Sequence, residues 1–137
     1  MNDLSGKTVK LSDFRGKGVI LIFWSQSNRA SQKQITDLGN IQKKYKDLVL
    51  IGITKDKDRD SLAKTVAQMK TTSIIVPDGE RLLKQYAVRS IPDSYYIDRD
   101  GLVKFHVAGS KMGYQTDIER RIKVILEESK VKSQYSR

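Results

Sequence analysis

Residues 19–24 read Val-Ile-Leu-Ile-Phe-Trp, a continuous apolar run rich in β-branched and aromatic side chains. A second run of the same kind, Leu-Val-Leu-Ile-Gly-Ile, occupies residues 48–53. Short continuous apolar runs are typical of strands that are covered on both faces, as they are in parallel sheets. We therefore predict two buried parallel strands at the centre of the fold.

The segment between these two runs carries apolar side chains at helical spacing, at Ile35, Leu38, Ile41 and Tyr45. Steps of three and four residues place these side chains on one face of a helix. A strand, a helix and a parallel strand form a βαβ unit, whose crossover is expected to be right-handed.

The same patterns extend this unit on both sides. Leu62, Val66 and Met69 predict a second helix. The other expected elements are strands over residues 8–11, 73–76, 94–97 and 102–108, a short helix near residues 82–86, connecting turns at 12–17 and 98–101, and a last helix over residues 115–129. Together these elements predict an α/β fold of three layers, α/β/α, with a mixed central sheet and an N-terminal β extension.

The length of 137 residues suits one domain spanning residues 1–137. We expect its core to extend from about residue 4 to residue 129 and the polar residues 130–137 to be a frayed tail. No apolar run approaches the roughly 18–20 residues that cross a bilayer, so no transmembrane segment is expected.

The composition excludes several kinds of reactive and metal-binding site. The chain has no cysteine and one histidine, His106. Disulfides, thiolate nucleophiles, cysteine-ligated metals and multi-histidine metal sites are therefore excluded within one chain, and we expect no metal and no cofactor. The net charge of +10 is spread evenly over the sequence, whereas specific nucleic-acid binding usually shows a basic cluster. We expect no specific nucleic-acid partner.

Four stretches resemble one known family: residues 4–17, residues 19–24, residues 86–92 (Tyr-Ala-Val-Arg-Ser-Ile-Pro) and residues 96–103 (Tyr-Ile-Asp-Arg-Asp-Gly-Leu-Val). In this order and spacing they are similar to the thioredoxin-like superfamily. Within it they look most like the TlpA/ResA-like thiol–disulfide oxidoreductases and the AhpC/TSA redoxins. The resemblance implies a thioredoxin fold and a cis peptide bond before Pro92. It also suggests an extracytoplasmic location, while a cytoplasmic one stays open.

The residues that carry the chemistry in that family are replaced here. The family pattern is Phe-Trp-x-x-Trp-Cys-x-x-Cys, whereas residues 23–31 read Phe-Trp-Ser-Gln-Ser-Asn-Arg-Ala-Ser. Asn28 stands at the position of the nucleophile and Ser31 at that of the resolving cysteine. Since thiol–disulfide exchange requires a thiolate, we expect no thiol redox activity from this chain. Two explanations stay open: natural loss of the cysteines, or cysteines that were mutated or are supplied by a partner.

The loop after residue 24 is the first candidate binding site. Ser27 or Asn28 is a favoured residue for capping the helix that follows. Alternatively, the amides at the helix start and Arg29 hold a small anion. Trp24 belongs either to an aromatic wall of this site or to the packing of the sheet.

The Ile91–Pro92 backbone is the second candidate site. In the resembled family, this backbone pairs with an extended substrate peptide, a small case of strand addition. The alternative is that Pro92 only shapes the turn into the next strand. His106 is predicted to lie beside Lys104 on the surface of the sheet, so a hydrolytic Ser31–His106 pair is not expected.

From these observations we predict a thioredoxin-like domain without redox cysteines that binds a protein or an extended peptide. The binding residues would be Trp24, Ser27, Asn28, Arg29, Ile91 and Pro92. The alternative is a thiol–disulfide oxidoreductase or a peroxiredoxin-type antioxidant protein by lineage.

Overall fold

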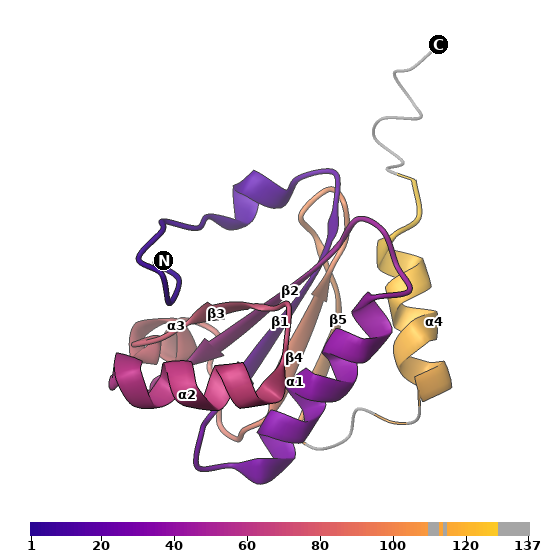
Figure 1. Cartoon of the computed structure of the whole chain (residues 1–137). Coiled ribbons are helices and arrows are strands. Elements are labelled where there is room, and N and C mark those ends of the chain that lie inside the picture. The colour runs from indigo at the N-terminus through magenta and orange to yellow at the C-terminus, as the bar shows by residue number, and fades with distance from the viewer. Residues whose placement is uncertain (110–112, 114, 129–137) are drawn as a thin grey trace.

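A computed structural model describes residues 1–109, 113 and 115–128, and its described part contains one five-stranded sheet (Figure 1). The strands are β1 (Gly18–Trp24), β2 (Leu48–Thr54), β3 (Ile74–Val76), β4 (Asp93–Ile97) and β5 (Val103–Ala108), in the spatial order β3-β2-β1-β4-β5. β1, β2 and β3 are parallel, while β4 is antiparallel to β1 and β5 to β4. The predicted central parallel pair and the mixed sheet are confirmed.

The helices cover both faces of this sheet. They are α1 (Arg29–Gln42), α2 (Arg59–Met69), α3 (Glu80–Gln85), α4 (Gln115–Ile125) and the short 3-10 helix η1 (Leu11–Phe14). Figure 1 shows α1 and α4 along one side of the sheet and α3 on the other. The predicted α/β/α order of layers is confirmed.

Every residue of β1 is buried, because each face of the strand packs into a different core. Ile20, Ile22 and Trp24 pack with apolar residues of α1, α2 and α4. Val19 and Phe23, with Leu21, pack with side chains of α3 and η1. A strand with helices on both faces needs apolar residues at every position, which explains the continuous run of residues 19–24.

The N-terminal segment differs from the prediction. Residues 8–11 do not form a strand: Thr8 makes only an isolated antiparallel bridge with Asn2, and η1 begins at Leu11. The Asp13 side chain accepts a hydrogen bond from the Lys10 N–H at 3.0 Å, a local contact that turns the chain into η1. Such side-chain contacts compete with a sheet ladder. The N-terminal β extension is thus reduced to one bridge.

The last helix also differs from its predicted length. α4 ends at Ile125, and the expected continuation to residue 129 reaches beyond the described residues at its last position. The predicted tail, residues 130–137, lies outside the described residues. Within the described part of the chain, no helix has both the length and the apolar character needed to span a membrane.

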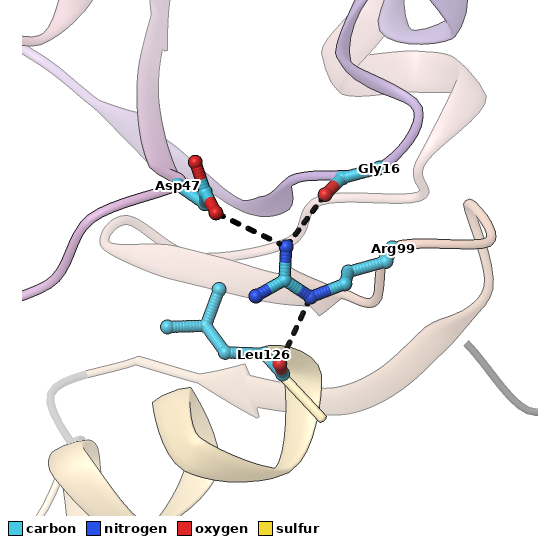
Figure 2. Close-up of polar contacts among 4 residues, drawn as sticks. All are labelled: Gly16, Asp47, Arg99 and Leu126. Carbon is cyan, nitrogen blue, oxygen red and sulfur yellow. Dashed lines mark hydrogen bonds and ion pairs between the residues drawn. The ribbon is translucent and has the colours of Figure 1, made fainter. Parts of the chain in front are cut away.

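Arg99, in the turn between β4 and β5, joins three separate segments (Figure 2). Its Nε donates to the Leu126 carbonyl at 2.8 Å, and its Nη1 donates to the Gly16 carbonyl at 2.7 Å. The same Nη1 lies 3.4 Å from Asp47 Oδ2. These contacts fix the end of α4 and the entry to β1 against the turn between β4 and β5.

Candidate functional site

The candidate site lies where β1 ends and α1 begins, at the bottom of Figure 1. Asn28 has an extended backbone and is the cap of α1, since its Oδ1 accepts a hydrogen bond from the Ser31 N–H at 2.9 Å. Of the two predicted caps, Asn28 performs this role. Ser27 is exposed, and its hydroxyl lies 3.0 Å from the hydroxyl of Ser25.

The other end of the Asn28 side chain reaches the second candidate segment. Asn28 Nδ2 donates a hydrogen bond to the Ile91 carbonyl at 3.2 Å. The Ile91–Pro92 peptide bond is cis, the isomer that the family resemblance implies. The structure therefore brings the two candidate sites together, and one side chain bridges them.

Ser31 is a buried structural residue. Its side chain has no exposed surface, and its hydroxyl lies 2.7 Å from the Asn28 carbonyl and 3.2 Å from the Ser25 carbonyl. The same oxygen accepts a hydrogen bond from the Ser25 N–H at 3.1 Å. These contacts satisfy the hydroxyl inside the protein, so Ser31 does not face a ligand.

Gln26 and Asp56, which the sequence prediction omitted, fix the loop before Asn28. The Gln26 N–H donates to Asp56 Oδ2 at 3.0 Å, and the same oxygen accepts from the Thr54 hydroxyl at 2.6 Å. The Gln26 side-chain oxygen accepts from the Thr65 hydroxyl of α2 at 2.7 Å. The available signal was the position of Asp56 two residues after β2, since parallel neighbouring strands end at the same edge of a sheet.

Trp24 does not belong to the site. We predicted Trp24 as a binding residue, but the side chain has no exposed surface and packs in the core beneath α1. Trp24 lies on the same face of β1 as Ile20 and Ile22, the face that packs against α1, α2 and α4, because every second residue of a strand faces the same side. Trp24 is therefore a core residue and is removed from the candidate binding residues.

Arg29 is the exposed first residue of α1. With Gln32 and Lys33 it lines an open cavity of about 380 Å³ between α1 and α2. The nearby Ser31 N–H is already bonded to Asn28, so this helix start offers an anion one amide fewer than an uncapped end would. The predicted anion site at Arg29 stays a prediction.

His106 and Asp93 form a pair near the same end of the sheet. His106 Nε2 lies 2.6 Å from Asp93 Oδ1, and the Asp93 side chain is 5% exposed. The imidazole also stacks on the Tyr95 ring, with centroids 4.2 Å apart and planes 6° from parallel. Burial raises the pKa of the Tyr95 hydroxyl, and the neighbouring Asp93 adds to this effect.

The predicted surface position of His106 is correct, whereas its pairing with Asp93 was missed. Because the Ser31 hydroxyl is buried and bonds to the carbonyls of Asn28 and Ser25 and to the Ser25 N–H, not to His106, the two do not form a nucleophile–base pair. Within the described ranges, no group of three or more His, Cys, Asp or Glu side chains is placed to hold a metal ion.

Comparison with known proteins assigns this arrangement to a family. Residues 1–106 match the family model described as the AhpC/TSA family. The chain belongs to the AhpC/TSA family.

Curated relatives of this AhpC/TSA chain are thiol–disulfide oxidoreductases. It is 30% identical over 120 residues to the thiol-disulfide oxidoreductase ResA of Bacillus thuringiensis subsp. konkukian, covering 85% of this chain and 69% of the relative. It is 29% identical over 128 residues to ResA of Geobacillus kaustophilus, covering 91% of this chain and 72% of the relative. By family, the chain is a thioredoxin-like thiol–disulfide oxidoreductase homologue.

The solved structures agree with the AhpC/TSA assignment. A putative thiol:disulfide interchange protein DsbE from Chlorobium tepidum superposes with a TM-score of 0.80 at 25% identity, covering 92% of this chain and 91% of that chain. This similarity confirms the thioredoxin fold. The AhpC/TSA scaffold is thus present in a chain that has no cysteine.

Proposed function

We propose that this AhpC/TSA chain is a non-catalytic binding module that holds an extended protein segment against the Ile91 backbone and the Asn28 loop. The observation that carries this proposal is the contact between Asn28 and Ile91. An asparagine and a buried serine stand at the two positions where the family pattern has cysteines, and neither supplies a thiolate. What such a site retains is its capacity to bind.

The backbone of the half-buried residue Ile91 supports binding by strand addition. In the described residues, the Ile91 N–H has no hydrogen-bond partner, while the Ile91 carbonyl already accepts from Asn28. A free donor just before the start of β4 suits the carbonyl of an extended segment, because backbone pairing provides affinity in this mode of recognition. The neighbouring exposed residues Ser27, Arg29 and Arg89 would contact the side chains of that segment.

A selection experiment tests this proposal. The purified chain is used to select from a library of random heptapeptides displayed on phage, and the best peptide is added to ¹⁵N-labelled protein. We expect the largest chemical-shift changes at the Ile91 amide and at the Asn28 side-chain amide. Selection of no peptide, or shifts confined to another surface, would contradict the proposal.

Two substitutions at Ile91 serve as a matched pair. Ile91→Val keeps the backbone N–H and is expected to bind the selected peptide as the original chain does. Ile91→Pro removes that donor, while also fixing φ and replacing the side chain, and is expected to abolish binding. If Ile91→Pro fails to fold, the shift of the Ile91 amide in the unmodified protein still decides the question.

A second candidate function is thiol–disulfide exchange or peroxide reduction with cysteines at positions 28 and 31 of the native gene, or with cysteines supplied by a partner. The similarity to ResA over 85% of the chain favours this alternative. The assays are reduction of insulin disulfides in the presence of dithiothreitol and consumption of peroxide. We expect no turnover from the pure chain, and clear turnover would overturn the binding-module proposal.

A further inference from the structure

We infer that the groove between α1 and α2, which opens at Arg29, holds the continuation of the segment bound at Ile91 and selects an acidic side chain there. The partner is thus an extended protein segment that carries an aspartate or a glutamate. This inference rests on the proposed function and names the chemistry of its ligand.

The groove begins one residue from the contact that joins the two candidate sites. Asn28 bonds to the Ile91 carbonyl at 3.2 Å, and the next residue, Arg29, is the first residue of α1 and lines the groove. The groove has a volume of about 380 Å³, and its walls come from residues 29–37 of α1 and 65–69 of α2. It is therefore continuous with the proposed binding site.

Gln26 fixes both walls of the groove against the loop that carries Asn28. Its side-chain oxygen accepts from the Thr65 hydroxyl at 2.7 Å and from the Ser61 hydroxyl at 3.2 Å, both on α2. Its carbonyl accepts from the side chain of Gln32 on α1. A ligand therefore does not have to order these walls, which lowers the cost of binding.

An extended segment is long enough to reach both Ile91 and the groove. In the sheet, β4 and β2 flank β1 on opposite sides, so the loop before β4 and the groove beside α2 lie on either side of the start of α1. A helix is about 10 Å across. An extended heptapeptide spans roughly 23 Å at about 3.3 Å per residue, enough to pair with Ile91, cross the start of α1 and enter the groove.

Arg29 supplies the charge that recognises the acid. The residue is exposed, and among the described residues neither a hydrogen bond nor an ion pair engages its guanidinium group. That group is a permanent cation with donors only, so its charge does not depend on its surroundings. A carboxylate can form two parallel hydrogen bonds with it, the geometry that makes such pairs strong.

The protein already engages the carboxylates near the groove. Asp37, the acidic residue of the lining, pairs with Lys33 at 2.8 Å, which leaves Arg29 as the excess charge of the lining. Asp58 caps α2 by accepting from the Ser61 N–H, and Asp56 accepts from the Gln26 N–H. Over their full lengths, α1 and α2 carry four cationic and two acidic side chains: Arg29, Lys33, Asp37, Arg59, Asp60 and Lys64. A ligand carboxylate therefore meets a net positive charge in this groove.

The first test uses the heptapeptides selected on the unmodified chain. We expect Asp or Glu to be enriched at the end that enters the groove and not at the end that pairs with Ile91, because Asp93 lies two residues after Ile91. One acidic peptide is then compared by titration with its counterpart that carries the matching amide. The acidic peptide should bind about 5–10-fold more tightly, as expected for one charge-assisted pair, and should shift the side-chain amide of Gln68 in the groove.

Arg29→Gln is the deciding variant, because it removes the charge from an exposed helix position. The preference for the acidic peptide should fall below about 2-fold, whereas Arg29→Lys should retain part of it, since an ammonium group keeps the charge without the two parallel bonds. Arg81→Gln is the matched control. It removes an exposed arginine from α3, on the other face of the sheet, and should leave the preference unchanged.

The pH dependence gives an independent readout. The preference should be the same at pH 6 and at pH 8, because arginine stays charged and a ligand carboxylate stays ionised over this range. A preference that changes between these two values would require a titrating group of the protein and would contradict the role of Arg29.

The outcomes separate the two proposals. If no peptide binds at Ile91, the proposed binding function fails and this inference fails with it. If peptides bind at Ile91 without acidic enrichment, or if Arg29→Gln keeps the full preference, the acidic groove is refuted and the binding module stands. If Arg81→Gln also removes the preference, it follows the net charge of the chain instead of the groove, and the inference is again refuted.

Discussion

Asn28 Nδ2 donates a hydrogen bond to the Ile91 carbonyl at 3.2 Å and so connects two residues that are 63 positions apart in the sequence. At the same time Asn28 Oδ1 accepts from the Ser31 N–H at 2.9 Å. A single amide side chain therefore caps α1 and holds the loop that precedes β4. Asparagine suits this position because its amide both donates and accepts.

Substitution of Asn28 should separate these two contacts. Asn28→Ala loses both the cap and the bond to Ile91, and we expect it to destabilise the protein by about 1–2 kcal/mol. Asn28→Asp retains an acceptor for the Ser31 N–H but has no donor for the Ile91 carbonyl, so its stability should be intermediate. Urea unfolding measures both values. Equal stability of Asn28→Ala and the unmodified chain would show that neither contact contributes.

Introducing cysteines at both positions should give the chain exchange chemistry. The double variant Asn28→Cys with Ser31→Cys places thiols at the start of α1, where the helix terminus lowers the pKa of a thiol. We expect it to form a disulfide and to reduce insulin with dithiothreitol as the electron source. Each single variant is the control and should show no internal disulfide. A double variant that folds but stays inactive would mean that a cysteine pair alone does not make this scaffold an oxidoreductase.

Arg99 should stabilise the folded protein, because its planar guanidinium group donates to two carbonyls at once. Arg99→Lys keeps the charge but cannot donate to both Leu126 and Gly16 from a planar group. We expect a loss of about 1–3 kcal/mol and faster amide hydrogen exchange at the end of α4. Asp47→Asn is the control: its contact with Arg99 is longer, at 3.4 Å, and its effect should be smaller. Unchanged exchange in α4 of Arg99→Lys would contradict this role.

Tyr45 and Glu119 should give the protein a measurable pH dependence. The Tyr45 hydroxyl donates to Glu119 at 2.5 Å, and this hydrogen bond is the main cause that raises the pKa of Tyr45 to about 12. The same bond, followed by one from Gln115, lowers the pKa of Glu119 below its ordinary value. NMR titration of the Tyr45 ring should show a midpoint near pH 12, and Glu119→Gln should move it toward 10.

The sign of the linked stability follows from these two directions. A raised pKa of Tyr45 means that its contribution is complete below pH 10 and is lost as the pH rises toward about 12. A lowered pKa of Glu119 means that its contribution is present above pH 4.5 and is lost as the pH falls through the folded-state value. An unchanged Tyr45 midpoint in Glu119→Gln would contradict the coupling.

Much of the fold could be predicted because its signals are local. The apolar runs at residues 19–24 and 48–53 specify buried parallel strands, and the spacing of Ile35, Leu38 and Ile41 specifies the helix between them. The strand predicted over residues 8–11 was wrong. At residues 8–11, the contact between Asp13 and the Lys10 N–H outweighs the β-propensity of a short segment with one sheet bridge.

The candidate site was predictable only in part. Asn28 and Pro92 were identified by their positions in a family pattern, and the capping role of Asn28 follows from its residue type. Trp24 was misassigned, because the sequence does not reveal that the last residue of β1 is still covered by the helix core and has no exposed surface. Gln26 and Asp56 were missed, since their bond joins loops that follow two different strands.

The sequence by itself determined the order of strands and helices from residue 19 onward and the absence of cysteine, because periodicity and residue type are properties of the chain alone. The tertiary structure decided that Asn28 bonds to Ile91 and that Asp93 holds His106. Hydrogen bonds between distant segments depend on strand register and on how closely loops approach. These distances are set when the sheet assembles and packs against its helices.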